Sequence, residues 1–305
     1  MSSATFLSSG DVIADRRFEW ARDLEAKGDL EAAADLLTQA LELKPNYAAA
    51  WFALGAVREK MGDVEGAVAA FEKARAADPQ DRHGAKLHLM RLGAAPLSIM
   101  PESYVRTLFD AYAPKFDTAL SERLGYRAPE LLLRAVKASG ARMNFAAALD
   151  LGCGTGLAGV AFRPYCDRFV GVDLSPAMLA QARGKGLYDR LVEVDIAAFL
   201  ADEAAARARY DLIVAADVFM YLPDLGPVLQ AAARVLAPGG LIAFSVETHA
   251  GAGAILRDTL RYAHSKDHAQ AALAAARLKP VSLDSASTRT EKGEPVPGLI
   301  VVASN

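Results

Sequence analysis

Hydrophobic positions follow two different patterns along the chain, and the change comes near Asn144. Before it, in residues 11–92, small and apolar residues recur at helical spacing. After it, short apolar runs alternate with amphipathic stretches, the pattern of a parallel sheet covered by helices on both faces. Strands are expected near 145–151, 167–172, 190–194, 210–216 and 240–246, and helices are expected to begin near Leu157, Pro176, Ile196 and Leu225. We therefore expect an all-α segment followed by an α/β domain.

The N-terminal pattern contains an internal repeat with a period of 34 residues. The equivalent positions are Gly28, Ala33, Leu37, Ala40 and Pro45 in the first copy and Gly62, Ala67, Phe71, Ala74 and Pro79 in the second. Small residues let paired helices pack closely, and each proline ends the second helix of its unit. Residues 1–92 therefore resemble two tetratricopeptide repeats, with a capping helix at 82–92, although Arg17, Ala21 and Leu24 stand where Trp, Gly and Tyr are usual.

Two functions for this repeat segment stay open. Two repeats make a short groove, and such stacks usually need further support. The segment could therefore pack on the second domain or self-associate. It could equally form a groove for a protein partner, or one wall of a ligand pocket in the second domain.

A short linker and a helical stretch connect the repeats to the α/β domain. Residues 93–101 are rich in Gly, Ala, Pro and Ser, as linkers are. In residues 102–140, four large side chains recur on one helical face, and Pro114 should break or kink the helix. These side chains are Tyr104, Leu108, Tyr112 and Phe116.

The strongest candidate for a ligand site is the loop that follows the first expected strand. Glycines at 152, 154 and 156 permit positive φ and remove Cβ atoms, so the backbone can approach a ligand closely. A second apolar strand ends in Asp173, about 20 residues on, where a ribose-binding carboxylate belongs. A nicotinamide dinucleotide site prefers the spacing G-x-G-x-x-G, whose third glycine would fall on position 157. This position is Leu157, which disfavours an oxidoreductase.

The segment Asp150-Leu-Gly-Cys-Gly-Thr-Gly156 resembles motif I of the class I S-adenosylmethionine-dependent methyltransferases. The resemblance extends over roughly residues 102–303 and includes four further landmarks: Asp173, Val194-Asp195-Ile196, the run 210–217 and the turn 236–241. It implies a methyltransferase domain at 102–305 with a Rossmann-like, seven-stranded sheet. A helix near 266–277 and strands near 279–289 and 297–303 would supply the antiparallel hairpin that closes such a sheet.

The resemblance also implies a cofactor, S-adenosylmethionine, with S-adenosylhomocysteine as the product. Asp150 would lie near the ammonium group, Asp173 would bind the ribose hydroxyls, and Asp217 would lie near the methionine end. The full predicted cofactor set is Asp150, Gly152, Cys153, Gly154, Gly156, Asp173, Leu174, Met178, Asp195, Ile196 and Asp217. Each of the acids has an alternative role, because an Asp at the end of a strand often caps the next helix.

The acceptor site is expected in the C-terminal third. His249 and His264 are candidate bases, and Arg261 and Arg289 could hold an anionic substrate through bidentate hydrogen bonds. Residues 109–117 are similar to the segment that folds over the cofactor in many small-molecule methyltransferases, so Tyr112 and Phe116 would help to close the site. The alternatives are surface arginines, solvent-facing histidines and aromatic rings that only pack in the core. His264 and His268 lack a third ligand, so no metal site is predicted.

Composition narrows the partners. The net charge is −3, and neither a basic stripe nor an acidic tail is visible, so nucleic acid is not expected as a partner. Apolar runs are of strand length, Met1–Gly10 lacks the features of a secretory signal, and only two cysteines are present. These features predict a cytoplasmic protein without a membrane span. The acceptor is expected to be a small molecule, with a carboxylate as one candidate. A protein-borne acceptor docked by the repeats, and a scaffold that binds cofactor without turnover, are the rival hypotheses.

Overall fold

The computed structural model describes residues 7–118 and 125–305, and they form two compact units. One unit ends at Thr107 and the other begins at Leu108, so the division falls inside α6 (Glu102–Tyr112). The expected linker at 93–101 lies N-terminal to this division. Part of the helical stretch expected at 102–140 falls on residues 119–124, which lie outside the described residues, as do the first six residues of the chain. In the described part of the chain, no helix is long and apolar enough to cross a membrane.

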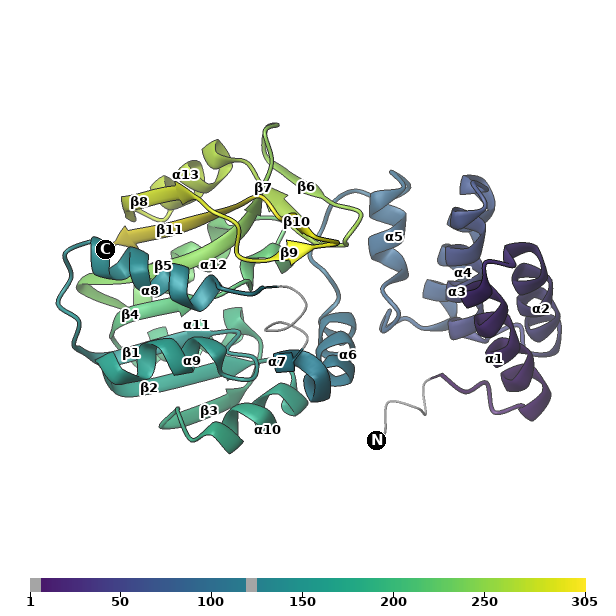
Figure 1. The fold of residues 1–305 in the computed structure, drawn as a ribbon, viewed down its shortest axis with the longest axis horizontal. Helices are drawn as coiled ribbons and strands as arrows, with labels where there is room; N and C mark the ends of the chain where they lie inside the picture. Colours follow the sequence, from purple (N-terminus) through teal and green to yellow (C-terminus); the bar gives the residue numbers. More distant parts are fainter. Residues whose placement is uncertain (1–6, 119–124) are drawn as a thin grey trace. The chain divides into compact units, whose positions relative to one another are not determined.

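The N-terminal unit consists of antiparallel helix pairs (Figure 1). Its helices are α1 (Val12–Lys27), α2 (Leu30–Leu43), α3 (Ala48–Lys60), α4 (Val64–Ala77) and α5 (Ala85–Arg91). The same turn occurs twice, 34 residues apart: Gly28 and Gly62 have φ of 85° and 83°, and Asp29 and Asp63 each cap the helix that follows. Only residues without a Cβ adopt this φ at little cost, so the repeated glycines end α1 and α3 in the same way.

The pair α3 and α4 packs closely because Gly55 has no side chain. A Cβ built on Gly55 would come within 2.7 Å of the Phe71 ring on α4. Phe71 itself is fully buried and belongs to a cluster that continues into α5 through Leu89. The expected helix at 82–92 is therefore present, at 85–91, and it covers the end of the second repeat.

The C-terminal unit is built on a mixed sheet whose main path has the strand order β3-β2-β1-β4-β5-β11-β8. Strands β1 to β5 run parallel, and β11 is antiparallel to both β5 and β8. The strands on this path are β1 (Phe145–Leu151), β2 (Cys166–Asp173), β3 (Arg190–Glu193), β4 (Tyr210–Ala215), β5 (Leu236–Thr248), β8 (Lys279–Ser285) and β11 (Gly298–Ser304). This path confirms the expected Rossmann-like architecture with a C-terminal antiparallel hairpin.

Two short strands extend the sheet beyond the predicted seven. β6 (Ala254–Leu256) and β7 (Tyr262–His264) pair with each other, and β7 also pairs with the end of β5. In the described part of the chain, the sheet thus has nine strands instead of seven. The physical reason is that β5 continues to Thr248, which leaves backbone groups for β7 to bond. A further pair, β9 (Thr290–Glu291) and β10 (Glu294–Pro295), forms a separate small hairpin.

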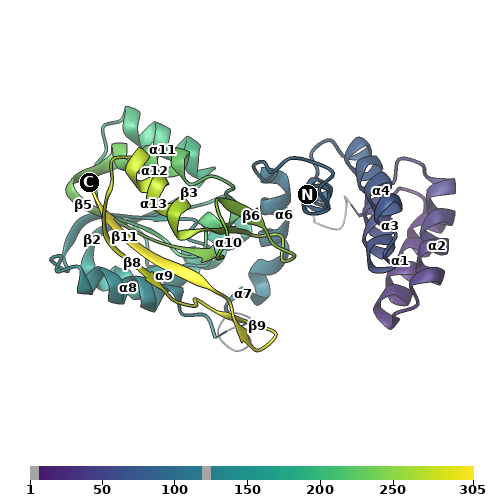
Figure 2. The same ribbon diagram turned by 90° about the horizontal axis from the view of Figure 1, so that it is seen from above.

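Helices cover both faces of the sheet (Figure 2). α8 (Ala128–Ala138) and α9 (Leu157–Phe162) lie on one face, and α11 (Ile196–Ala205), α12 (Gly226–Val235) and α13 (Lys266–Ala275) lie on the other. α10 (Pro176–Lys185) connects β2 to β3. Alternate β1 residues divide between the faces: Ala148 packs toward α8 and α9, whereas Leu149 and Leu151 pack toward α11 to α13. Both apolar faces are thereby buried, and the carboxyl ends of β1, β2 and β4 meet at one edge.

We expect the substitution Gly55→Ala to destabilise the repeat unit. Its methyl group would press on Phe71, and overpacking of this kind costs about 1–3 kcal/mol, of which better helix propensity offsets about 1 kcal/mol. Urea unfolding followed by circular dichroism measures the difference. Gly184→Ala, in α10, is the control, because a Cβ there meets nothing within 4 Å and should stabilise slightly. A Gly55→Ala variant as stable as Gly184→Ala would contradict the close helix contact.

Candidate functional site

The glycine loop between β1 and α9 has the backbone conformation that its sequence predicts. Gly152, Gly154 and Gly156 have φ of 64°, 54° and 92°, all in the left-handed region. At Gly152, a Cβ would come within 2.5 Å of Val218, so the loop lies against the segment after β4. At Gly154, the nearest atom to a built Cβ is 4.0 Å away, on Phe116. The middle of the loop therefore leaves its backbone accessible, as a ligand-binding turn requires.

Asp173 lies at the end of β2, and its carboxylate is held by two backbone amides. Gly154 N–H donates to Oδ2 at 2.8 Å, and Ser175 N–H donates to Oδ1 at 2.8 Å. Burial raises the pKa of Asp173, whereas these two hydrogen bonds lower it. The carboxylate is thus fixed beside the glycine loop, and each oxygen keeps a further lone pair for a ligand hydroxyl.

Asp150, at the end of β1, is fully buried. Its Oδ2 accepts a hydrogen bond from the Tyr188 hydroxyl at 2.6 Å, and its Oδ1 has no hydrogen-bond partner among the described residues. Burial raises the pKa of Asp150 to about 7, and the Tyr188 hydrogen bond works in the opposite direction. Because a buried carboxylate oxygen without a donor is costly, Oδ1 is a natural acceptor for a cationic or N–H group of a ligand.

The other predicted cofactor residues differ in their contacts and in their burial. Asp195 caps α11, because its Oδ1 accepts from the amides of Ala197 and Ala198 at 2.8 and 3.2 Å. Met178 is fully buried in α10, and Cys153 is buried with its pKa raised well above the ordinary value by burial. Two further predicted residues, Leu174 and Ile196, are half-buried.

Two carboxylates of residues 109–117 bind this segment to the glycine loop and to the start of α10. Asp110 accepts a hydrogen bond from Ser175 Oγ and another from the amide of Ala177, at the start of α10. Asp117, in α7 (Phe116–Thr118), accepts from Thr155 Oγ1 in the glycine loop and pairs with Lys185 at 2.6 Å. The short helix η1 (Ala113–Lys115) contains Pro114, which confirms the predicted break after α6. This segment thus connects the loops that follow β1 and β2.

Aromatic rings cluster beside these attachments. Phe116 lies 5.5 Å from Tyr112 and 6.3 Å from Phe109, and Phe109 lies 5.4 Å from Tyr221, as measured between ring centroids. Phe116 is also the ring nearest Gly154. The structure therefore places Phe116 beside the loop, and Tyr112 packs against Phe116. That these rings close the site stays a prediction. Tyr221, in η4 (Phe219–Tyr221), was not predicted.

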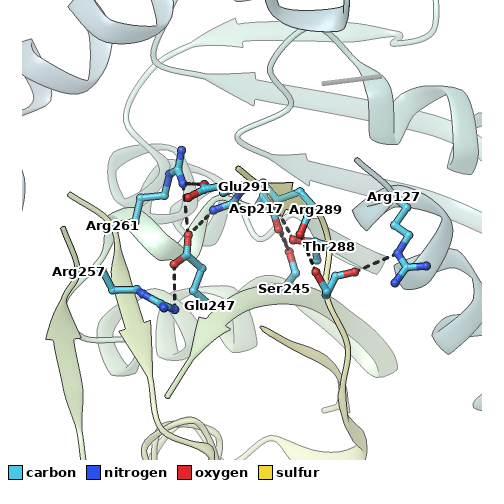
Figure 3. A network of polar contacts seen from close by, with 10 residues as sticks. Arg127, Asp217, Ser245, Glu247, Arg257, Arg261, Thr288, Arg289 and Glu291 are labelled. Carbon is cyan, nitrogen blue, oxygen red and sulfur yellow. Dashed lines mark hydrogen bonds and ion pairs between the residues drawn. The ribbon is translucent and has the colours of Figure 1, made fainter. Parts of the chain in front are cut away.

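Asp217 belongs to a polar network at the ends of β4 and β5 (Figure 3). Its φ is 55°, an uncommon value for Asp. Ser245 Oγ accepts from the Asp217 amide at 2.8 Å and donates to its Oδ1 at 2.7 Å. Oδ2 accepts from Thr288 Oγ1 at 3.0 Å and from Arg289 Nη1 at 2.7 Å. Asp217 therefore lies at the site edge with both carboxylate oxygens engaged by the chain itself.

Arg289 is the centre of this network, and only 4% of its side chain is exposed. It pairs with Asp217, with Glu247 at the end of β5, and with Glu291 at 3.1 Å. Although burial lowers it, these three carboxylates raise the pKa of Arg289 above its usual range. The guanidinium is consequently a fixed cation that ties the segment after β8 to the ends of β4 and β5.

Three further arginines belong to the network (Figure 3). Arg261 pairs with Glu291 and lies 3.6 Å from Glu247, and Arg257 lies 3.7 Å from Glu247. Arg127 donates to the Ser287 carbonyl at 3.1 Å instead of to a carboxylate. The sequence predicts that Arg261 and Arg289 hold an anionic substrate; the structure brings them together, but with their charges already compensated by acids of the chain.

The two candidate bases differ in their surroundings. His264 is fully buried on β7 beside His268, with ring centroids 5.2 Å apart. Burial, followed by the His268 ring, lowers the pKa of His264 to about 4, so its imidazole is neutral near pH 7. His249 follows β5, where Gly251 N–H donates to Nδ1 at 3.1 Å and Nε2 lies 3.1 Å from the Gly253 carbonyl. Among the described residues, no group of three metal-ligating side chains surrounds either histidine.

Several residues at this edge were not among the predicted site residues. Asp110 and Asp117 lie inside the segment that the resemblance identified, but their anchoring contacts depend on the fold. Glu247 and Glu291 lie two residues from His249 and Arg289, respectively, but their ion pairs depend on the fold. Tyr188 and Tyr126 carry no sequence signal; burial, followed by the charges of Asp217 and Asp150, raises the pKa of Tyr126 well above its ordinary value, which places it near both acids.

The residues at the carboxyl ends of β1 and β2 fit S-adenosylmethionine. Asp150 Oδ1 offers an acceptor for the ammonium group, and the Asp173 carboxylate offers two oriented acceptors for ribose hydroxyls. Between them the loop backbone is open at Gly154. These carboxylate oxygens are hydrogen-bond acceptors, and the ammonium group and ribose hydroxyls of the cofactor are donors that match them.

Removing the central guanidinium should cost far more stability than removing one at the rim. Arg289→Met leaves Asp217 and Glu247 without their buried partner, for which we expect a loss of about 3–5 kcal/mol in urea unfolding. Arg257→Met is the matched control, because its side chain is 34% exposed and its pair should contribute about 1 kcal/mol or less. Adding Glu247→Gln to Arg289→Met should recover part of the loss. Equal losses for the two single variants would refute the central position of Arg289.

Comparison with known families agrees with this geometry. Residues 149–242 match the family described as a methyltransferase domain, and residues 24–89 match the family described as a tetratricopeptide repeat. The human methyltransferase-like protein 27 is 41% identical over 82 residues, which are 26% of this chain and 33% of that protein. The match thus spans about a third of the length of this curated relative.

A solved structure shares the fold. The 1,6-didemethyltoxoflavin-N1-methyltransferase of Burkholderia thailandensis, with bound 1,6-didemethyltoxoflavin and S-adenosylhomocysteine, superposes with a TM-score of 0.53. The superposition covers 69% of this chain and 92% of that chain at 21% identity. The strand order, the glycine loop and the two family matches lead to one conclusion. The chain carries a methyltransferase domain of the class I fold, and tetratricopeptide repeats precede it.

Proposed function

We propose that this protein is an S-adenosylmethionine-dependent methyltransferase that acts on a small-molecule acceptor. One observation carries the proposal: the Asp173 carboxylate is fixed by the amide of Gly154, in a loop where the nearest neighbour of a Cβ built on that glycine is the Phe116 ring, at 4.0 Å. A carboxylate held in this way at the end of β2 is arranged for a ribose. The Oδ1 of Asp150, which is buried and has no hydrogen-bond partner in the part of the chain that the structure describes, supports the same ligand from the neighbouring strand.

In this mechanism the residues of the chain bind the cofactor and orient it toward the acceptor. When bound, S-adenosylmethionine supplies a methyl group on a sulfonium that is already activated for displacement. Asp150 and Asp173 hold the two polar ends, and the glycine loop supports the part between them. Phe116 and the carboxylates of Asp110 and Asp117 cover the loop and exclude water. Their contribution to rate is the alignment of donor and acceptor.

The acceptor would approach from the side of Asp217, Tyr221 and the arginine network. A small carboxylate is one candidate, but it would have to replace Glu247 or Glu291 at arginines that are already paired. An uncharged or basic acceptor meets no such competition. We therefore place small carboxylates and small amines side by side in the first acceptor panel.

Neither histidine is arranged as a strong general base. His264 is buried with a pKa lowered to about 4, and His249 bonds to the backbone of its own loop. A base is needed only for an acceptor that is protonated when it reacts. The surroundings of the two histidines thus favour an acceptor that is nucleophilic near neutral pH without assistance.

A protein-borne acceptor is the second candidate, and the repeat unit is the reason. On α1, three large apolar side chains are exposed, namely Val12 at 82%, Ile13 at 60% and Trp20 at 53%. Repeat stacks of this kind use extended surfaces for binding. Methylation of a protein in a lysate, with no turnover of small molecules, would favour this candidate. Cofactor binding without any methyl transfer would favour a scaffold instead.

Calorimetric titration with S-adenosylmethionine and S-adenosylhomocysteine tests the proposal first, followed by transfer of a labelled methyl group to the acceptor panel. We expect binding of both compounds and labelling of at least one small molecule. A folded protein that binds neither compound would refute the proposed function.

The substitution Asp173→Ala should weaken binding of S-adenosylhomocysteine by roughly 2–3 kcal/mol, because two ribose hydrogen bonds are lost at about 1 to 1.5 kcal/mol each. Calorimetry measures this loss. Asp167→Ala is the matched control, because Asp167 is exposed at the start of the same strand. Unchanged affinity of a folded Asp173→Ala variant would exclude the ribose-binding role.

A further inference from the structure

Tyr188 occupies a space that exists because three glycines surround it. A Cβ on Gly156 would come within 3.1 Å of the Tyr188 ring, one on Gly171 within 3.0 Å, and one on Gly159 within 2.7 Å of the hydroxyl oxygen. These glycines come from the cofactor loop, from β2 and from α9. Glycines from three separate elements therefore surround one phenol ring. Phe169 packs on the same ring at a centroid distance of 4.9 Å.

The phenol ring ends at Asp150. The Tyr188 hydroxyl donates to Oδ2 at 2.6 Å, while Oδ1 of the same carboxylate has no partner among the described residues. The carboxylate is thus divided into an oxygen fixed by the protein and an oxygen left for a ligand. Because the hydroxyl keeps its proton near neutral pH, with burial raising the pKa of Tyr188 well above its ordinary value, it acts as a permanent donor.

From this arrangement we propose that Tyr188 is a positioning residue of the cofactor site, which keeps Asp150 ionised and oriented so that Oδ1 can receive the ammonium group of the cofactor. The proposal rests on the proposed function for the identity of the ligand. It goes beyond that function by assigning a role to a residue outside every recognised motif. Tyr188 acts through Asp150 and does not itself contact the cofactor.

The groups around Asp150 determine the direction of the effect. Burial raises the pKa of Asp150 to about 7, the Asp173 charge on β2 adds to the rise, and the Tyr188 hydrogen bond opposes it. The other titratable groups within its electrostatic reach are Cys153 in the loop, Cys166 at the start of β2 and Tyr126 before α8. Burial raises the pKa of all three, so they are neutral near pH 7. Removing the hydroxyl of Tyr188 should therefore raise the pKa of Asp150 further.

The variant Tyr188→Phe tests this inference through the pH dependence of cofactor affinity. Ligand binding that needs ionised Asp150 is lost as the pH falls through the pKa of that group in the free protein. We expect the variant to bind S-adenosylhomocysteine about tenfold more weakly than the parent near pH 6, but within about twofold near pH 9, taking one pKa unit for a hydrogen bond to a charged group. Titration of the ligand itself cancels, because both proteins bind the same compound.

A role for Tyr188 in packing alone gives a different result. The affinity of Tyr188→Phe would then fall by the same factor at every pH, or would not fall at all, and either outcome overturns the proposal. Gly159→Ala provides a second variant, because its methyl group displaces the hydroxyl without removing it, and it should reproduce the acid-side loss. Tyr165→Phe is the control: its hydroxyl bonds to exposed Lys137, and its loss should leave affinity unchanged at both pH values.

A readout without ligand separates this inference from the proposed function. Carbon-13 NMR of the aspartate carboxyl groups, with Asp150 assigned through Asp150→Asn, should show a titration midpoint near 7 that moves upward in Tyr188→Phe. A midpoint that stays in place would overturn the coupling of Tyr188 to Asp150. If the midpoint moves but the parent protein binds no S-adenosylhomocysteine, the coupling holds and the proposed function fails.

Discussion

The site depends on glycines near the carboxyl ends of β1 and β2, where the backbone carries no side chains. Gly154 donates its amide to Asp173, and this bond requires the loop to turn back toward β2 with positive φ at three positions. Gly171, on β2 itself, leaves room for Tyr188 between Leu191 and Cys153. A Cβ at most of these positions would move either the loop or the ring. The glycines therefore contribute both the open surface above the sheet and the packed space beneath it.

Two carboxylates emerge from this arrangement in different electrostatic states. Asp173 receives two backbone N–H groups, which favour its ionised form, whereas Asp150 receives a single hydroxyl and is fully buried. Desolvation raises the pKa of both, but within the described residues only Asp150 also lacks a donor on one oxygen. A cationic ligand would supply that donor and a compensating charge together. The free-energy cost of the unpaired acceptor would then be recovered on binding, and a buried acid can favour one ligand strongly in this way.

The sequence predicts local features well and long-range partners poorly. Strand β1 and the first residues of α9, α10 and α11 agree with the periodicity and with the caps at Ser175 and Asp195, since these depend on neighbours in the chain. The start of β5 was placed too late, because residues 236–241 resemble a turn and Gly239 has a φ of 74°. The strand nevertheless pairs with β4 from Leu236 onward, with a register shift between Tyr210 and Leu212. The strands β6 and β7 were missed, since three-residue strands carry no period. β7 forms where β5 extends to receive it, and β6 pairs with β7 in turn.

The polar network around Arg289 shows the same limit for charges. Arginines at 261 and 289 and acids at 217, 247 and 291 come from four separate segments, so the sequence shows their charges but not which of them cancel. In the folded chain each guanidinium meets carboxylates, and the network joins the ends of β4 and β5 to the segments before β7 and after β8. Such a network fixes the positions of these segments relative to one another. It adds less to the free energy of folding, because desolvation offsets much of the attraction between buried charges. Because Arg261 and Arg289 are already paired with acids of the chain, an anion that entered here would have to replace one of these carboxylates.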